Sequence, residues 1–285
     1  MDRAAAVASS ARGVGASARA ASPSRPPPPP RDVAVMSGGG GKLRVLALHS
    51  WRTSASIFAK QLAVAGWTND DGTGLGDQCE FVCVDAPHPA SGEIPRDVAR
   101  AFEGPYYEWW DASRDDRDGS LRYVGDDASV AFVERVARED GPFDGVVGFS
   151  QGATFAGLLA AIGAVDGRGP FAAVSAEAPP VFAILLSGML ARTSEAAATY
   201  AEAKDSPRHA SIPTMHVIGA ADRVMPPALS ERLASEFADP VIVTHERGHV
   251  VPRLERDALA TARNFLAARA AAAREARDGS PRSSL

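Results

Sequence analysis

The sequence has only two cysteines in 285 residues, Cys79 and Cys83, which excludes a fold held together by many disulfides. They lie four positions apart in an apparent strand. A strand rises roughly 3.3 Å per residue, and bridged cysteines need Cα atoms within about 7 Å of each other, so the two cannot bond to one another. We therefore expect two buried free thiols and a reducing compartment, which favours the cytoplasm.

Long hydrophobic runs and an excess of positive charge are also missing. The longest apolar stretch, around Val181–Leu186, is far shorter than the about 20 residues that span a bilayer, so we expect no stable membrane insertion. The net charge of the chain is −5, which gives no general attraction to nucleic acid. Residues 1–41 carry +3, which leaves −8 for the remainder. No metal-ligand cluster is visible, and we expect neither a metal nor a cofactor.

The first 41 residues lack the hydrophobic periodicity of a folded segment. Alanine, serine and arginine dominate, and Pro26–Pro30 adds an extended run. An N-terminus rich in Arg and Ser and poor in acids is typical of a transit peptide to the mitochondrion or chloroplast. Simple disorder, with Met36 as the true start, explains the composition equally well. We expect one folded domain over residues 42–274 and a disordered tail over residues 275–285.

From Lys42 onward, short apolar runs alternate with stretches compatible with helices. This alternation predicts an α/β fold, with a mostly parallel sheet covered by helices on both faces. The expected strands are Leu43–Leu48, Phe81–Asp85, Gly145–Phe149, Val181–Ser187, Thr214–Ile218 and Val241–Thr244. The expected helices are Ser56–Ala65, Ser129–Glu139, Ala153–Ile162, Pro227–Phe237 and Arg256–Ala273.

The pentapeptide Gly148–Gly152 reads G-x-S-x-G and lies between an expected strand and an expected helix. A nucleophile elbow places its serine on such a strand-to-helix turn, where the hydroxyl stands clear of the backbone. Glycines on either side relieve the crowding of the turn, because they lack Cβ. The pattern and its context together predict that Ser150 is a catalytic nucleophile.

A serine nucleophile needs a histidine base and a third group that orients the base. In α/β-hydrolases the chain order is serine, acid, histidine. Asp222 follows the expected strand Thr214–Ile218, and His249 follows the last expected strand. Since ligands of open α/β sheets bind at the carboxyl ends of strands, we predict the triad Ser150, Asp222 and His249. His245 is the alternative base.

The developing oxyanion also needs hydrogen-bond donors. One is expected to be the backbone N–H of Gln151, the residue after the nucleophile, and the other to come from the loop after an earlier strand. The segment His49-Ser50-Trp51 supplies such a loop. The N–H of Trp51 is the preferred donor, with Ser50 as the alternative.

A connection of about forty residues separates the strand that ends at Asp85 from the helix that begins near Ser129. Connections of this length are uncommon in compact domains and are often functional. This one carries Tyr106, Tyr107, Trp109 and Trp110. These aromatic side chains could line or cover an apolar substrate pocket, or they could anchor a long loop to the core.

Several stretches of the chain resemble the FSH-type serine hydrolases, an α/β-hydrolase group that includes the ovarian-cancer-associated protein 2 of animals. The similarity covers the chain from about Leu43 to Ala268. The stretches that carry it are Leu46–Phe58 (LALHSWRTSASIF), Val84–Pro87 (VDAP), Trp109-Trp110, Gly141–Ala153 (GPFDGVVGFSQGA), Phe182–Gly188 (FAILLSG), Pro213–Pro226 (PTMHVIGAADRVMP) and His245–Pro252 (HERGHVVP).

The resemblance implies a catalytic serine at Ser150, an acid at Asp222 and a base at His249. Two positions depart from the family pattern: Ser50 stands where glycine usually follows the histidine, and Arg247 stands where glycine is more frequent. The first could reshape the oxyanion loop, and the second adds a cation close to the base. Neither removes a catalytic group.

The function expected from these features is hydrolysis of small-molecule carboxylic esters, acyl or aryl, through an acyl-enzyme on Ser150. Two alternatives stay open, an acyl-thioesterase and a non-catalytic protein that binds a ligand in a hydrolase fold. The sequence names neither the natural substrate nor the oligomeric state.

Overall fold

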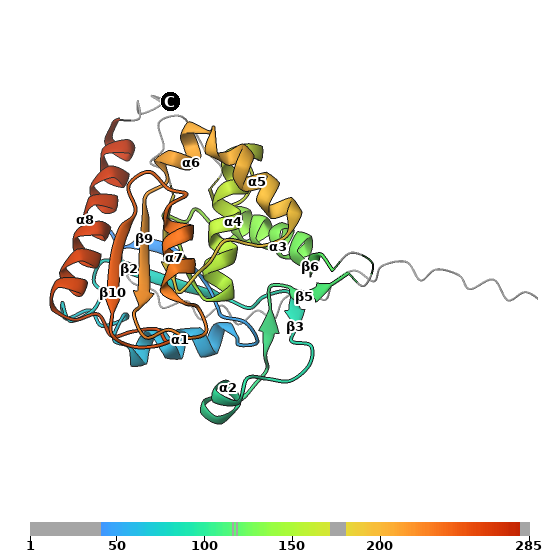
Figure 1. Cartoon of the computed structure of the whole chain (residues 1–285). Helices are drawn as coiled ribbons and strands as arrows, with labels where there is room; N and C mark the ends of the chain where they lie inside the picture. The colour runs from blue at the N-terminus through green and yellow to red at the C-terminus, as the bar shows by residue number, and fades with distance from the viewer. Residues whose placement is uncertain (1–40, 116, 118, 172–180, 280–285) are drawn as a thin grey trace, which may run out of the picture.

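A computed structural model describes residues 41–115, 117, 119–171 and 181–279 of the chain. At its centre is a six-stranded sheet of order β10-β9-β8-β7-β1-β2, in which every neighbouring pair is parallel (Figure 1). The strands are β1 (Leu43–Leu48), β2 (Cys79–Val84), β7 (Gly145–Phe149), β8 (Phe182–Leu186), β9 (Thr214–Gly219) and β10 (Val241–His245). The expected α/β fold with a mostly parallel sheet is confirmed.

Helices cover both faces of this sheet, as Figure 1 shows. Side chains of α1 and α8 pack on one face, and side chains of α3, α4 and α7 pack on the other. The helices are α1 (Ala55–Val64), α2 (Arg96–Ala101), α3 (Asp126–Glu139), α4 (Gln151–Asp166), α5 (Ser194–Lys204), α6 (Pro207–Ser211), α7 (Pro227–Ala234) and α8 (Arg256–Gly279). Alternate strand residues supply the two apolar layers, because successive side chains of a strand point to opposite faces.

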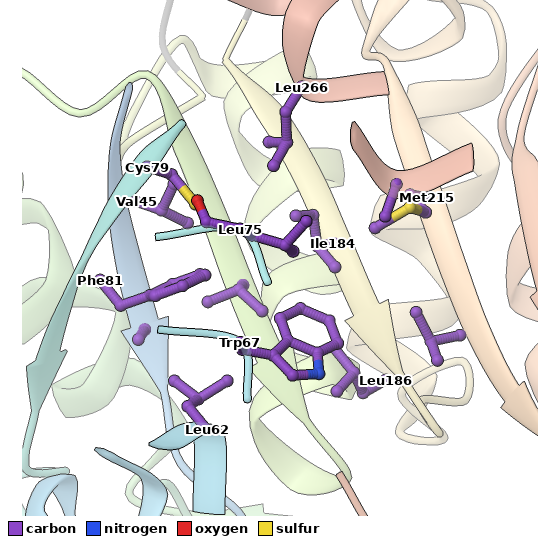
Figure 2. Packing of buried hydrophobic residues seen from close by; sticks show 14 of the residues in the cluster. Val45, Leu62, Trp67, Leu75, Cys79, Phe81, Ile184, Leu186, Met215 and Leu266 are labelled. Atoms are coloured by element: carbon purple, nitrogen blue, oxygen red, sulfur yellow. The ribbon is translucent and has the colours of Figure 1, made fainter. Parts of the chain in front are cut away.

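Figure 2 shows the core on the face covered by α1 and α8. The indole of Trp67 lies among strand side chains such as Ile184 and Leu186, and its Nε1–H donates a 2.7 Å hydrogen bond to the carbonyl of Pro252. This bond ties the segment after α1 to the segment that follows β10. Both cysteines are free and buried, as expected.

The strand order reverses between β1 and β7, since the chain builds outward from β1 to β2 and then returns to the other side of β1. Such a reversal point opens a crevice at the carboxyl ends of the two strands, and open α/β sheets bind their ligands there. The loop after β1 and the turn that carries Ser150 meet at this point.

The long connection between β2 and α3 contains more regular structure than expected. It forms two antiparallel pairs, β3 (His88–Pro89) with β4 (Tyr107–Glu108) and β5 (Asp111–Arg114) with β6 (Leu121–Val124), in addition to α2. The N–H of Tyr107 donates to the carbonyl of Thr53, which fastens β4 to the loop after β1. In Figure 1 α2 projects from the body of the domain.

The expected limits of the folded domain can be compared with the residues that the structure describes. Helix α8 runs to Gly279, past residue 275, where the tail was expected to begin. The reason is that alanine, arginine and glutamate, which favour helices, continue beyond residue 270. Residues 1–40 and 280–285, on which the transit-peptide and most of the tail interpretation depend, lie outside the described residues. Within the described ranges, no helix has the length and apolar character needed to cross a membrane.

Candidate active site

Ser150 lies on the turn between β7 and α4 with φ 55° and ψ −112°, a strained conformation of the kind found at functional sites. A Cβ atom on Gly148 would stand 2.3 Å from the carbonyl oxygen of Gly152, and one on Gly152 would stand 2.1 Å from that of Leu48. Both neighbours are backbone atoms that cannot swing away, so these two positions require glycine. The G-x-S-x-G sequence therefore forms a sharp strand-to-helix turn around the serine.

The structure brings Ser150, His249 and Asp222 together at the carboxyl edge of the sheet. Nε2 of His249 lies 2.9 Å from Oγ of Ser150, and its Nδ1 lies 2.8 Å from Oδ2 of Asp222. The three residues follow β7, β10 and β9, in that order. The Ser150 hydroxyl is thus within hydrogen-bond reach of an imidazole that a carboxylate holds from the opposite side.

The carboxylate of Asp222 is held by its own turn. Its Oδ1 accepts hydrogen bonds from the N–H groups of Val224 at 2.9 Å and Met225 at 2.8 Å, which leaves Oδ2 for His249. Burial by itself would raise the pKa of Asp222, but the hydrogen bonds from Met225 and His249 outweigh it and bring the pKa below its ordinary value. Asp222 is therefore ionised at neutral pH and can orient the histidine.

His245, the alternative base, faces its own loop. Its Nδ1 accepts a 3.2 Å hydrogen bond from the N–H of Arg247, and burial lowers its pKa. The imidazole that meets Ser150 is that of His249, whose ring packs against Phe149 with centroids 4.9 Å apart. The geometry favours His249 over His245 as the base.

The loop after β1 is organised by the buried ring of His49. The N–H of Ala86 donates to its Nε2 at 3.0 Å, so the ring proton lies on Nδ1, which donates to the carbonyl of Ser50 at 2.8 Å. The carbonyl of His49 in turn accepts a 2.9 Å bond from the indole N–H of Trp109. Burial lowers the pKa of His49 to about 4, so this histidine is neutral at pH 7 and has a structural role.

The two predicted oxyanion donors belong to segments on either side of Ser150. Gln151 is the first residue of α4, and the N–H groups at a helix start have no partner within the helix. Its side-chain amide is engaged elsewhere, because Oε1 accepts from the N–H of Trp109 at 3.1 Å and Nε2 donates to the carbonyl of Trp110 at 2.8 Å. Trp51 lies in the β1–α1 loop with its ring partly exposed, under the Arg52 guanidinium.

The aromatic residues of the long connection divide into buried anchors and half-buried groups. Trp109 and Trp110 are 0% and 3% exposed and belong to the core layer with Phe155 of α4, so they anchor the long connection, and neither lines the cavity beside His249. Tyr106 donates its hydroxyl to the carbonyl of Phe102, and Tyr107 packs against the same core layer. Sequence alone could not separate these roles, since aromatic side chains suit a core and a pocket equally.

A cavity of about 460 Å³ opens beside His249. It lies between α1, α2 and the loop after β10. The residues that line it are Lys60, Gln61, Val64, Ala65, Asp97, Val98, Ala101, Phe102, Arg247, His249, Val250, Val251, Arg253 and Glu255. Of these, only Arg247 had been singled out from the sequence, besides His249 itself. The rest come from segments that the sequence does not connect with one another.

Metal-ligating side chains do not gather elsewhere in the part of the chain that the structure describes. No group of three or more His, Cys, Asp or Glu side chains there could hold an ion. The two thiols are unsuited to such a role, because burial raises their pKa, that of Cys83 to about 12.

Comparison with known proteins shows the family of the chain. Residues 36–260 match the family described as serine hydrolase (FSH1). A protein of Anopheles gambiae named as an esterase is 35% identical over 224 residues, which cover 76% of this chain and 75% of that protein. The esterase OVCA2 of Homo sapiens is 32% identical over 222 residues, covering 74% of this chain and 89% of the human protein.

Among solved structures, the fold is similar to that of acyl-protein thioesterase 2 of Zea mays, with a TM-score of 0.55 and 22% sequence identity. The match covers 81% of this chain and 95% of that one. The sheet, its helices and the strand-to-helix turn around Ser150 define an α/β-hydrolase. The chain belongs to the FSH1 serine hydrolase family.

Proposed function

We propose that this protein hydrolyses carboxylic esters through an acyl-enzyme on Ser150. The Ser150 hydroxyl attacks the acyl carbonyl carbon while its proton passes to Nε2 of His249. The tetrahedral intermediate collapses, the bond to the leaving group breaks, and His249 returns the proton to the departing oxygen. Water then attacks the acyl-enzyme by the same route, with His249 as the base.

The observation that carries the proposal is the continuous hydrogen-bonded path from Ser150 to Asp222. Its two links measure 2.9 and 2.8 Å, and they join residues 99 and 27 positions apart in the sequence. A site that only binds a ligand does not need a serine, a histidine and an aspartate joined by hydrogen bonds in this order. The strained backbone of Ser150 adds support, since the two enclosing glycines permit a conformation that a plain surface turn does not need.

The backbone N–H groups of Gln151 and Trp51 are the proposed oxyanion donors. Gln151 brings the positive end of α4 to the developing charge. Trp51 approaches from the β1–α1 loop. A Cβ on Gly152 would strike the carbonyl oxygens of Leu48, at the end of β1, and of His49, at the start of this loop. The close packing of the start of this loop on the start of α4 supports this pairing.

A panel of p-nitrophenyl esters of increasing acyl length, beside matched thioesters, tests the proposal. We expect turnover by the wild type and loss of nearly all of it in Ser150→Ala, with Ser235→Ala at the exposed end of α7 as the matched serine control. A preference for thioesters would redirect the assignment to an acyl-thioesterase. A folded protein that hydrolyses none of them, or a Ser150→Ala variant with full activity, would contradict the proposal.

A further inference from the structure

The cavity beside His249 has apolar walls with charged groups among them. Its apolar side chains come from three segments that face one another: Val64 and Ala65 at the end of α1, Val98, Ala101 and Phe102 at α2, and Val250 and Val251 after β10. None of the residues of α2 is buried, although Val98 and Phe102 are half-covered. An aliphatic segment of a small molecule would cover these walls.

The charges that line the cavity are Lys60, Arg247 and Arg253 against Asp97 and Glu255. Within the residues that the structure describes, none of the five takes part in an ion pair with a neighbour. Cations are in excess here, whereas the chain from residue 42 onward carries −8 overall. A local cationic excess on an acidic protein concentrates an anion at this place.

The position of His249 on the cavity wall tells which part of a substrate occupies it. His249 lines the cavity, whereas Ser150 and the loop with Trp51 are not among its lining residues. The protonated imidazole must give its proton to the leaving oxygen or sulfur, which therefore has to lie within hydrogen-bond reach of Nε2. A cavity that begins at this residue extends on the side of the leaving group.

We infer that the cavity binds the leaving group of the substrate, and that this alcohol or thiol carries an anionic group, a carboxylate or a phosphate, beyond a short aliphatic segment. The inference rests on the proposed hydrolysis. The acyl part then extends away from the cavity, and the anion of the leaving group contacts Lys60 and Arg253, which approach from α1 and from the loop after β10. Arg247 adds charge close to the point of proton transfer.

Matched substrates test directly whether the enzyme prefers an anionic leaving group. Butyryl esters of ω-hydroxycarboxylic acids, from glycolate to 6-hydroxyhexanoate, are compared with the esters of the corresponding primary amides, which have nearly the same shape and no charge. Butyryl phosphopantetheine and butyryl pantetheine form the phosphate pair. We expect the anionic member to have a kcat/KM about threefold to tenfold higher at low salt at one or more chain lengths, since each exposed charge pair contributes modestly. The ratio should approach one at high ionic strength.

Variants test whether these cations are responsible. In Lys60→Met/Arg253→Met the ratio of anionic to neutral kcat/KM is expected to fall close to one, and in Lys60→Arg/Arg253→Lys it is expected to persist. Arg208→Met, on α6, is the matched control that removes a cation far from the cavity. Asp97→Asn should raise the ratio, because it removes an opposing charge from the same wall.

Three results would overturn the inference. The first is a wild-type ratio of anionic to neutral kcat/KM of one at every chain length and in the phosphate pair, and the second is a raised ratio that persists in Lys60→Met/Arg253→Met. The third is an equal preference for an anion on the acyl side, as in hemisuccinyl esters of neutral alcohols. Failure of the inference is distinguishable from failure of the proposed function, since the neutral esters report hydrolysis by themselves. Absence of turnover on all of them would remove both.

Discussion

Arg52 and Glu108 form a buried ion pair that joins the β1–α1 loop to β4. Nε of Arg52 lies 3.0 Å from Oε2 of Glu108, and the two side chains are 11% and 2% exposed. The N–H and the hydroxyl of Ser91 both donate to Oε1 of Glu108, and the guanidinium of Arg52 also donates to the carbonyl of Glu93. Since Arg52 follows Trp51, this network fixes the loop that carries a proposed oxyanion donor.

Removal of one member of this pair should destabilise the protein strongly. We expect Arg52→Met to lower the free energy of unfolding by about 3–5 kcal/mol, because Glu108 would remain buried without its countercharge. The double variant Arg52→Met/Glu108→Leu should lose much less than the two single variants together, since an apolar pair of similar volume avoids the unpaired charge. Urea unfolding of the three variants measures both; additive losses would contradict this account of the pair.

Two glycines of α4 should differ in their response to the same substitution. Gly152→Ala would push Cβ against the backbone of Leu48, at 2.1 Å, and we expect a loss of roughly 1–3 kcal/mol in stability together with most of the activity. Gly157→Ala meets only a side-chain methyl of Leu233 at 3.0 Å and a hydroxyl at 3.3 Å. It should be close to neutral, because alanine also favours the helix by about 1 kcal/mol. Thermal unfolding and ester hydrolysis report the two outcomes; equal effects would contradict the packing described.

Substitution of Asp222 by asparagine should separate catalysis from binding. The amide keeps the shape but cannot stabilise an imidazolium, so we expect kcat to fall by about 10³–10⁴ with little change in KM. In the wild type the pKa of Asp222 is lowered, so this carboxylate stays ionised even at a pH equal to the ordinary pKa of an aspartate. Protonation of Asp222 should therefore not limit activity at any pH above that ordinary pKa. A kcat of Asp222→Asn within a few-fold of wild type would exclude Asp222 as the orienting acid.

Acid should weaken the fold before it protonates the carboxylates. Burial lowers the pKa of both His49 and His216 to about 4, so the folded protein keeps them neutral while the unfolded chain protonates them below about 6.5. The stability they contribute is complete above pH 6.5 and is lost as the pH falls towards 4, by about 3 kcal/mol for each histidine. His49→Gln should flatten this dependence, and His88→Gln is the control. Urea midpoints between pH 7 and pH 4 measure it, and an unchanged slope in His49→Gln would contradict it.

The sheet could be predicted because each of its strands is a short apolar run with a clear end. β1 and β7 match their expected bounds, and the others differ by one or two residues at their ends. The small pairs β3–β4 and β5–β6 could not be predicted, since strands of two to four residues are too short to show a periodicity. Helices α5 and α6 were missed for another reason: their Ala-, Glu- and Ser-containing stretches lack a continuous apolar stripe.

The triad candidates could be nominated because each follows a strand and because their order along the chain fits the class. The wall of the cavity could not, because Lys60, Asp97 and Arg253 are brought together only by the packing of α1, α2 and the loop after β10. The burial of Trp109 depends on a similar contact between residues distant in the sequence. Its indole bonds to the carbonyl of His49, a residue 60 positions away, and this draws the ring into the core.

The most direct test of the central claim is covalent labelling with a fluorophosphonate, followed by peptide mass spectrometry. Such a reagent phosphonylates a serine only where a neighbouring base activates it. We expect the wild type to carry one label on the peptide that contains Ser150, with no label in Ser150→Ala and greatly slowed labelling in His249→Ala. A folded wild-type protein that stays unlabelled, or that carries the label on another residue, would contradict the assignment of Ser150 as the nucleophile.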